Sequence, residues 1–583
     1  MSSTSYYENI IIQCLLGQAT NCTAPSIRNV RDRGVLNSGF LTGNTAPFAS
    51  TVEVALDGGF FQGASVTGNT WSFPLPKGPS VWKQNSLHKV TVRSGPLSAQ
   101  NTIMIRKGSN YDVNGDGFSD VLVGANQFSA GTGKAYIFYG SVQGIVSQGA
   151  TSANTNLVGI PSGQFGWAVA LGDVNGDGYS DAIVGAPGAG VDSVFIYHSL
   201  GGDGIPNGAS PNSTLSAGSI MFFGGTVATG DINGDGFEDV VVGSYGYSTS
   251  SGRVDVFYSS GTSGVPTGGL STAKSTLIGS VLNGRFGITV ATGDSNGDGY
   301  ADVLVGADGI SRSYIFHSDG TGGISGQDLS AGGTANTLLI GETGSQFGIS
   351  VSLGDVTADG FQDALIGARS YTANQGRAYV FHSNGSSGIP NQDLSGSGFA
   401  NTILTGQIAG SFFGISVSLG DVNGDGSADA LVGAYGFGTG NSFIFLSDGS
   451  SGIVSQNLQS GGTAHSTFTG ETAGDQFGIF VRLVDANGDG CSDVAVGAYG
   501  YSGGGNTGRV YIFSGSSSGI PSVGAPSANT ILTGEPASQF GYSIASNRKT
   551  ENQTFLEKNL YRWKTILFRR EDQEDSQSHF RNS

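Results

Sequence analysis

The sequence predicts an all-β protein whose largest part is a seven-bladed β-propeller. The same short phrases recur seven times in the same order, at intervals of 58 to 66 residues. Each copy contains four short apolar stretches of strand length, and no helical periodicity lies between them. Short strands with regular turn signals, repeated at a fixed period, are typical of propeller blades. The 100 glycines among 583 residues suit a chain with many tight turns.

Each repeat opens with a Phe-Gly strand, such as FGISVSLG, that leads into an acidic loop. An apolar strand of the type VLVGA follows the loop, and an aromatic strand such as RAYVF and a weaker strand such as NTLLI complete the unit. VLVGA is apolar at consecutive positions, which predicts a sheet buried on both faces, as between stacked blades. The phenylalanines that open these strands are Phe165, Phe223, Phe286, Phe347, Phe413 and Phe477.

An offset between the first and last repeats predicts how the ring closes. The first acidic loop has no Phe-Gly strand before it, whereas SQFGYSIA at 538–545 has no acidic loop after it. Pairing this last strand with the strand that follows the first loop completes seven blades. Such closure would remove the free sheet edges that promote aggregation. We therefore assign residues 110–545 to the propeller.

Three further segments flank the propeller. Residues 24–109 contain STVEVALDGG, NTWSFPLP, LHKVTVRSG and NTIMIRKG, which we interpret as strands of a small Ig-like β-sandwich. Residues 1–23 are assigned to a truncated or disordered N-terminal segment. Residues 546–583 form a charged tail with 14 charged residues and no glycine. The tail is either poorly ordered, or helical, or an out-of-register reading of the gene.

Seven acidic loops of the type GDVNGDGYSD concentrate negative charge in tight turns without neighbouring basic residues. Because like charges repel at short range, a bound cation is the simplest explanation. Calcium fits best, since it takes six to eight oxygen ligands in flexible geometry. The twelfth residue of the second loop is Val184, where an EF-hand needs a bidentate glutamate, so a loop-to-strand site is expected. The loops begin at Asp112, Asp173, Asp231, Asp294, Asp355, Asp421 and Asp485.

The candidate calcium ligands occupy alternate positions of each loop, numbered here from its first aspartate. Positions 1, 3, 5 and 9 would use side-chain oxygens, and position 7 its backbone carbonyl. These residues are Asp112, Asn114, Asp116, Phe118, Asp120, Asp173, Asn175, Asp177, Tyr179, Asp181, Asp231, Asn233, Asp235, Phe237, Asp239, Asp294, Asn296, Asp298, Tyr300, Asp302, Asp355, Thr357, Asp359, Phe361, Asp363, Asp421, Asn423, Asp425, Ser427, Asp429, Asp485, Asn487, Asp489, Cys491 and Asp493.

The fifth loop departs from this pattern and is expected to hold the weakest of up to seven structural ions. Thr357 replaces the asparagine, and Ala358 replaces the first glycine. The alternative interpretation of all the loops is an Asp/Gly-rich turn that binds no metal.

Composition excludes several classes of protein. The formal net charge of −18 argues against nucleic-acid binding, because phosphates need basic partners. Seven calcium ions would reduce that charge to −4. Three cysteines are too few for a disulfide framework, and no stretch is long and apolar enough to span a membrane. No signal peptide is evident, which suggests an incomplete N-terminus.

Aromatic residues recur between the second and third strands of several repeats, in loops expected on the face opposite the acidic loops. Exposed aromatic rings on a rigid scaffold make good contacts with proteins or sugars. The alternative is that the first ring of each pair packs between blades. The candidate partner-binding residues are Tyr247, Tyr371, Phe437 and Tyr501.

The combination of Phe-Gly strands, DxNGDGxxD loops and Val-Gly-Ala strands resembles the FG-GAP repeats of the integrin α-subunit β-propeller. The resemblance covers residues 112–545, and the glycine-rich repeats look most like bacterial surface or secreted members with an Ig-like module. It implies structural calcium on one face and partner binding on the other. Only Gly185, Ala186 and Pro187 spell the family's Gly-Ala-Pro, and seven metal loops exceed the number in integrins. Pairing with an integrin β-type subunit is therefore not expected.

Together these features predict a secreted or cell-surface, calcium-binding propeller that engages an extracellular protein or glycan in an adhesion-like role. Catalysis is not expected, because no His/Asp/Glu constellation lies outside the metal loops. Two alternatives stay open. The chain could be the propeller of a secreted hydrolase or lyase, or a passive surface spacer.

Overall fold

A computed structural model describes residues 24–545, apart from 28–34, 37–39, 47–48, 76–86, 97, 108–110, 189, 191 and 503–504. Residues 112–545 contain seven antiparallel sheets of four main strands each, and the predicted all-β propeller is confirmed. The inner strands contact one another in a closed circle, and each sheet continues outward from its inner strand. The inner strands are β14 (Ala168–Gly172), β18 (Thr226–Gly230), β23 (Thr289–Gly293), β28 (Phe347–Gly354), β33 (Val417–Gly420), β38 (Phe480–Val484) and β43 (Ser543–Ala545).

The second strand of each sheet follows an acidic loop and is fully buried, as its continuous apolar sequence predicts. These strands are β10 (Val121–Ala125), β15 (Asp181–Ala186), β19 (Asp239–Ser244), β24 (Asp302–Ala307), β29 (Asp363–Ala368), β34 (Asp429–Ala434) and β39 (Asp493–Ala498). The third strands are β11 (Lys134–Phe138), β16 (Ser193–Tyr197), β20 (Arg253–Phe257), β25 (Arg312–Phe316), β30 (Arg377–Phe381), β35 (Asn441–Phe445) and β40 (Arg509–Phe513).

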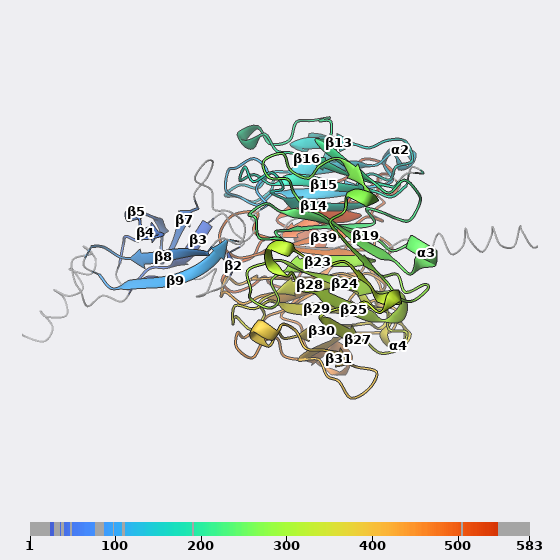
Figure 1. Ribbon diagram of the computed structural model, residues 1–583. Helices are drawn as coiled ribbons and strands as arrows, with labels where there is room; N and C mark the ends of the chain where they lie inside the picture. The colour runs from blue at the N-terminus through green and yellow to red at the C-terminus, as the bar shows by residue number, and fades with distance from the viewer. Residues whose placement is uncertain are drawn as a thin grey trace, which may run out of the picture.

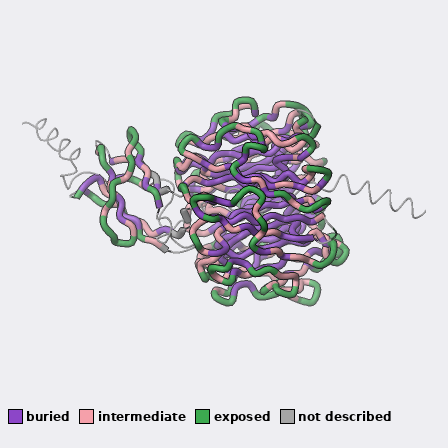
Figure 2. The backbone as a smooth tube through the Cα atoms, turned by 90° about the horizontal axis from the view of Figure 1, so that it is seen from above, coloured by how far each residue is buried: buried purple, intermediate pink, exposed green. Residues whose placement is uncertain are grey.

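The fourth strand alternates between buried and partly exposed residues because it lies near the outer edge of the sheet. The fourth strands are β13 (Thr155–Val158), β17 (Ser213–Ser216), β22 (Ser275–Ile278), β27 (Thr337–Ile340), β32 (Thr402–Thr405), β37 (Ser466–Thr469) and β42 (Thr530–Thr533). Figure 2 shows buried backbone through the interior of the ring and exposed backbone at the connecting loops.

Six sheets carry a fifth, two-residue strand that the sequence did not indicate. Each pairs in parallel with the fourth strand of a sheet but belongs to the next repeat. It covers an outer edge that would otherwise expose unpaired backbone groups. These strands are β12 (Gln148–Gly149), β21 (Gly268–Gly269), β26 (Gln327–Asp328), β31 (Gln392–Asp393), β36 (Gln456–Asn457) and β41 (Val523–Gly524).

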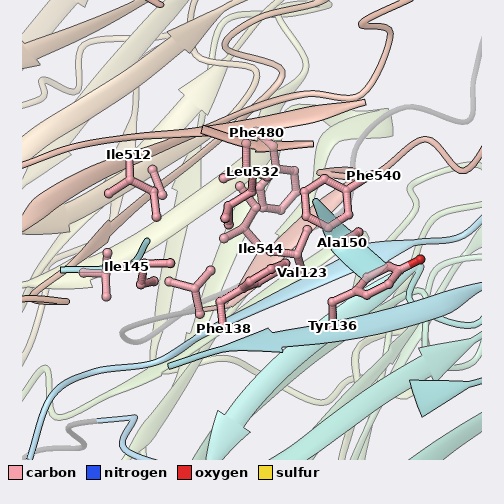
Figure 3. Close-up of a cluster of buried hydrophobic side chains, with 14 of the residues drawn as sticks. Val123, Tyr136, Phe138, Ile145, Ala150, Phe480, Ile512, Leu532, Phe540 and Ile544 are labelled. Carbon is pink, nitrogen blue, oxygen red and sulfur yellow. The ribbon is translucent and has the colours of Figure 1, made fainter. Parts of the chain in front are cut away.

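The ring closes as the offset of the repeats predicts. Strand β43 pairs antiparallel with β10, so the end of the described chain completes the first sheet. Strand β12 of the first repeat also pairs with β42 of the last sheet. Side chains from both ends of the propeller, including Tyr136, Phe480 and Phe540, fill the core at this seam (Figure 3).

Helical structure in the described residues is confined to single turns. Three four-residue turns, α2 (Phe128–Gly131), α3 (Tyr247–Ser250) and α4 (Tyr371–Asn374), lie between second and third strands, on one side of the ring (Figure 1). Their middle residues are left-handed; in α3, Ser248 and Thr249 have φ values of 46° and 54°. Short 3-10 turns are η2 (Ala150–Ser152), η3 (Gly201–Asp203), η4 (Leu270–Thr272), η5 (Asp308–Ile310), η6 (Gly320–Gly322), η7 (Leu329–Ala331), η8 (Gly385–Ser387), η9 (Leu458–Ser460) and η10 (Ala525–Ser527).

Residues 26–107 form two further sheets, with strand orders β1-β3-β7-β6 and β2-β9-β8-β4-β5. Trp71 is buried between hydrophobic side chains of both sheets, and its indole N–H donates to the Ser26 carbonyl oxygen at 3.0 Å. The Ig-like assignment stays a prediction, and segments 1–23 and 546–583 lie outside the described residues. The strands are β1 (Ser26–Ile27), β2 (Val35–Leu36), β3 (Phe40–Asn44), β4 (Glu53–Leu56), β5 (Gln62–Gly63), β6 (Ser65–Thr67), β7 (Thr70–Pro74), β8 (Leu87–Arg93) and β9 (Gln100–Lys107).

Candidate calcium loops and the opposite face

All seven acidic loops lie on one face of the ring, which we call the acidic face. In six sheets the loop connects the inner strand to the second strand; for example, β14 ends at Gly172 and β15 begins at Asp181. The first loop leads into β10, whose inner partner β43 comes from the other end of the propeller. The sequence-predicted ligands of each loop are thus brought together locally, at the same end of every sheet.

Inside a loop, the carboxylates are held by backbone N–H groups of the same loop. In the second loop, Asp173 Oδ2 accepts from the Gly178 N–H at 2.9 Å, and Asp177 Oδ1 accepts from the Tyr179 N–H at 2.9 Å. The amide of Asn175 donates to Asp177 Oδ2 at 3.0 Å. Gly178 has a φ of 89°, a left-handed conformation that glycine adopts without strain. The chain therefore preshapes the loop through hydrogen bonds.

The aspartate at position 9 connects the loop to the rest of its sheet. Asp181 is fully buried, and its Oδ2 accepts from the Val174 N–H at 3.0 Å while its Oδ1 accepts from the Ser199 N–H at 2.9 Å. Ser199 follows the third strand. The same two bonds recur around Asp302, from Ser295 and Ser318. Position 9 therefore has a structural role in addition to its predicted role as a ligand.

Burial, with repulsion between neighbouring carboxylates, raises the pKa values of several aspartates at positions 1 and 9 of the loops. Burial, followed by the neighbouring charge of Asp177, raises the pKa of Asp173 to about 7. Burial raises the pKa of Asp302 to about 8, and the charge of Asp294 contributes to the rise. A raised pKa means that ionising these two carboxyl groups costs free energy that the surrounding groups of the chain do not fully offset.

The chemistry of the loop fits a hard cation, although the carboxylates do not converge on a single point. Within the described ranges, no three His, Cys, Asp or Glu side chains form a ready metal-binding group. One buried acceptor is compatible with a cation, since Asp231 is 1% exposed and its Oδ1 has no hydrogen-bond partner. Carboxylate, amide and carbonyl oxygens are the ligands that calcium prefers. The predicted ligand roles stay predictions.

The fifth loop differs in structure at the two positions where it differs in sequence. The Thr357 N–H and hydroxyl both turn to Asp363 Oδ2, at 3.1 and 3.5 Å, whereas the asparagines of the other loops bond to the aspartate at position 5. Ala358 adopts a φ of 54°, which is strained for a residue with a side chain. Asp359 therefore lacks the asparagine bond that orients its counterparts.

On the opposite face, three of the four predicted partner-binding rings are half-buried rather than exposed. The Arg377 guanidinium lies 3.6 Å from the centre of the Tyr371 ring, and that of Arg509 lies 3.8 Å from the centre of the Tyr501 ring. Tyr247 is also half-buried, with Arg253 at 5.6 Å. These arginines begin the third strands, so the rings cover charged side chains of their own repeats.

Phe437, the fourth predicted ring, is 57% exposed. The first aromatic residues of the pairs pack inside the structure, as the alternative interpretation holds. Tyr245 stacks on Phe222 with ring centres 4.7 Å apart, and Tyr435 stacks on Phe412 at 5.2 Å.

The sequence reasoning missed exposed apolar residues between fourth strands and the following inner strands. Ile160, Ile220 and Leu282 are 47%, 68% and 64% exposed. Their loops contact the loops between second and third strands, since the Asn283 N–H donates to the Thr249 carbonyl oxygen at 3.1 Å. They therefore lie on the same face as Phe437. The sequence does contain a signal for these apolar residues, because other repeats have Gly-Glu-Thr or Gly-Glu-Pro in the corresponding loops.

Three histidines occupy one structural position after the third strand, as the repeat alignment indicates, and pack against glycines of the next repeat. A Cβ atom added to Gly264 would lie 2.5 Å from His198 Nε2, and one at Gly388 would lie 2.7 Å from His317 Nε2. Burial lowers the pKa of His198. This spacing assigns the histidines to packing between blades.

No helix in the described part of the chain is long and apolar enough to cross a membrane.

The ring of repeated sheets with acidic loops on one face defines a β-propeller whose repeats each carry an Asp/Gly-rich loop. The FG-GAP repeat family matches residues 165–204, 223–257, 286–322, 347–381, 413–455 and 477–513, and an FG-GAP-like repeat matches 112–184. The chain is therefore an FG-GAP repeat protein of the integrin α-like type.

Curated relatives match part of the chain. It is 31% identical over 243 residues to integrin alpha-5 of Xenopus laevis, covering 37% of this chain and 20% of that protein. It is 35% identical over 169 residues to the phosphatidylinositol-glycan-specific phospholipase D of Homo sapiens, covering 26% of this chain and 20% of that protein. The chain thus spans about a fifth of the length of each relative.

A solved structure of the exotype rhamnogalacturonan lyase YesX matches 87% of this chain and 83% of its own, with 11% identity and a TM-score of 0.33. A TM-score this low carries no argument about fold or function.

Proposed function

We propose that the protein is a calcium-stabilised, extracellular β-propeller that binds a protein or glycan through the face opposite its acidic loops. The observation that carries the metal assignment is the repeated acidic loop, with a buried and unpartnered Asp231 Oδ1 in one copy. In each loop, a calcium ion would be held by the side chains at positions 1, 3, 5 and 9 and the carbonyl at position 7. It would supply the positive charge that offsets carboxylate repulsion.

The site assignment can be tested with a matched pair of substitutions. Asp177→Asn removes one carboxylate charge from the second loop while keeping its shape. Asp203→Asn removes an equal charge from an exposed residue outside the loops. Asp177→Asn should bind one calcium ion fewer, or bind it at least tenfold more weakly, whereas Asp203→Asn should match the wild type. If both variants bind calcium like the wild type, the second loop is not a calcium site.

The partner surface is assigned to exposed apolar residues on the face opposite the acidic loops. Ile220, Leu282 and Phe437 stand on short loops that rigid sheets hold, and partially exposed apolar groups of this kind gain most from burial by a partner. The similarity to integrin alpha-5 supports an adhesion-like role and an extracellular location.

The partner surface is tested by replacing Ile220, Leu282 and Phe437 with serine and screening extracellular-matrix proteins and glycan arrays. A control variant replaces Val146 and Val454, which are 69% and 62% exposed outside these loops. Any ligand found for the wild type should bind the triple variant at least tenfold more weakly, about 1.4 kcal/mol, and should bind the control normally. If the wild type, the triple variant and the control variant all bind the ligand equally well, this surface is not the partner-binding surface.

A second candidate function is the propeller of a secreted hydrolase. The similarity to phosphatidylinositol-glycan-specific phospholipase D favours it, and the matched region is 20% of that enzyme. A hydrolase panel run on the purified chain separates the two candidates. Turnover that survives the apolar triple substitution would favour the enzyme.

A further inference from the structure

The seven acidic loops are joined to one another by backbone hydrogen bonds that run around the whole ring. In each case the N–H at position 8 of one loop donates to the carbonyl oxygen at position 1 of the preceding loop. The donors and acceptors are Ser180 and Asp112 (2.8 Å), Glu238 and Asp173 (2.9 Å), Ala301 and Asp231 (2.9 Å), Gln362 and Asp294 (3.2 Å), Ala428 and Asp355 (2.8 Å), Ser492 and Asp421 (2.6 Å), and Ser119 and Asp485 (3.4 Å). The last bond connects the first loop to the seventh and closes the circle.

These bonds connect predicted ligands in neighbouring loops through two peptide groups. The carbonyl of Tyr179, a predicted ligand in the second loop, belongs to the same peptide group as the Ser180 N–H. That N–H bonds to the Asp112 carbonyl, whose peptide group contains the Val113 N–H. The Val113 N–H in turn donates to Asp120 Oδ2 at 2.7 Å, and Asp120 is a predicted ligand in the first loop.

Aromatic packing joins the same neighbouring loops in four of the seven pairs. A Cβ atom added to Gly115 in the first loop would lie 2.2 Å from Cε1 of Tyr179 in the second, so the ring rests directly on the glycine. Only glycine leaves room for this contact. The corresponding pairs are Phe237 on Gly176, Tyr300 on Gly234 and Phe361 on Gly297.

The seventh loop has Cys491 in place of the aromatic residue, and the fifth and sixth loops depart from the pattern in a matched way. The fifth loop has Ala358 where the others have glycine, and the sixth loop has Ser427 where an aromatic ring would rest on it. The methyl group of Ala358 would occupy the position that a ring at 427 needs. The absence of the ring therefore compensates for the presence of the methyl group.

We infer that the acidic loops are coupled, so that calcium bound in one loop favours binding in the loop before it. The inference rests on the proposed calcium function. If the position 7 carbonyl held calcium, its peptide group would be more strongly polarised and its N–H would donate a stronger bond to the preceding loop, because hydrogen bonds in a chain reinforce one another. The stronger bond would restrict the preceding loop, so that binding a second ion there would cost that loop less conformational entropy. The ring consequently takes up calcium cooperatively.

The coupling is tested by calorimetric titration of calcium chloride into the chelator-treated full chain. The wild type should bind with a Hill coefficient above 1. Tyr300→Ser keeps every predicted ligand but removes the ring from Gly234, and Ser is the natural residue at the same position of the sixth loop. It should lower the Hill coefficient and weaken part of the isotherm by about fivefold, within the usual range of coupling between sites. Phe399→Ser, at a 64% exposed ring outside the loops, is the matched control and should change neither.

A gain-of-coupling variant guards against simple loss of stability. Ser427→Tyr alone should lower the melting temperature, because the new ring meets the Ala358 methyl group. Ala358→Gly together with Ser427→Tyr should recover the melting temperature and raise the Hill coefficient. Full calcium uptake with a Hill coefficient of 1 in all variants would overturn the coupling and leave the calcium function intact. No calcium uptake by the wild type would overturn the proposed function and the coupling with it.

Discussion

Val123 and Ile544 are direct cross-strand partners in β10 and β43, although 421 residues separate them in the sequence. Both side chains are buried in the hydrophobic core at the seam between the first and last sheets. This pairing turns a linear array of repeats into a closed ring. The stability of the propeller should therefore depend on a three-residue strand at the end of the described chain.

Two truncations test the seam. A chain that ends after residue 547 keeps β43 and should melt like the full chain. A chain that ends after residue 535 loses β43, exposes the edge of β10 and uncovers apolar side chains, so it should melt at a lower temperature and aggregate. Light scattering and calorimetry distinguish the two, and identical behaviour would contradict ring closure by β43.

The stability of the calcium-free protein should fall as the pH rises from about 5 to 8. Burial raises the pKa values of Asp239, Asp302 and Asp363 to about 8, far above the ordinary value of 3.8. A carboxyl group whose pKa is raised in the folded state favours folding while it is protonated. That contribution is present below pH 4 and is lost as the pH rises through the folded-state pKa.

Saturating calcium should remove most of this pH dependence, because a bound cation stabilises the ionised carboxylates. Melting temperatures measured in chelator and in calcium, across pH 5 to 8, provide the test. Stability in chelator that rises with pH over this range would contradict the raised pKa values of these carboxyl groups.

Changing the fifth loop to the sequence common to the other loops should increase its affinity for calcium. Thr357→Asn returns the amide that orients the aspartate at position 5, and Ala358→Gly removes the left-handed strain, which costs about 1 kcal/mol. The double variant should raise the melting temperature and increase calcium affinity at one site. Asn296→Thr with Gly297→Ala, the reverse change in the fourth loop, should have the opposite effects. Unchanged affinity in both double variants would show that these two positions do not set the strength of the site.

The half-buried tyrosines on the opposite face should contribute more to stability than to partner binding. Tyr371→Ser and Tyr501→Ser each remove a ring that covers an arginine, a contact that contributes about 0.5 to 2 kcal/mol. Both should lower the melting temperature, whereas Phe437→Ser should leave it unchanged. Equal melting temperatures for all three variants would show that the arginine contacts add nothing to stability.

The main features of the fold follow from local patterns that repeat. The VLVGA-type strands are apolar at consecutive positions, which predicts sheets buried on both faces, as in a propeller. The Phe-Gly strand at 538–545 has no acidic loop after it, which predicts that it pairs with the first sheet and closes the ring. The fifth strands were not predictable, since two residues such as Gly268 and Gly269 carry no strand signal and pair only because the next blade lies beside them.

The candidate sites were predictable to different degrees. Ligand positions within one loop are local, so the spacing of Asp173, Asn175 and Asp177 indicates them directly. The contact between the Tyr371 ring and the Arg377 guanidinium depends on how a loop folds back onto the start of the next strand, which sequence periodicity does not show. The relationship between Ala358 and Ser427 could not be predicted from the sequence, because it depends on how close neighbouring loops lie in the assembled ring.

If the acidic loops hold calcium, the number of ions bound per molecule should equal the number of loops. Equilibrium dialysis of the chelator-treated chain against calcium should give close to seven ions per molecule, one for each loop. The affinity should be modest, with Kd values of about 10⁻⁴ to 10⁻³ M, the range of calcium sites in extracellular modules. If the chain takes up no calcium, and its melting temperature is the same in chelator and in calcium, the acidic loops are not calcium sites.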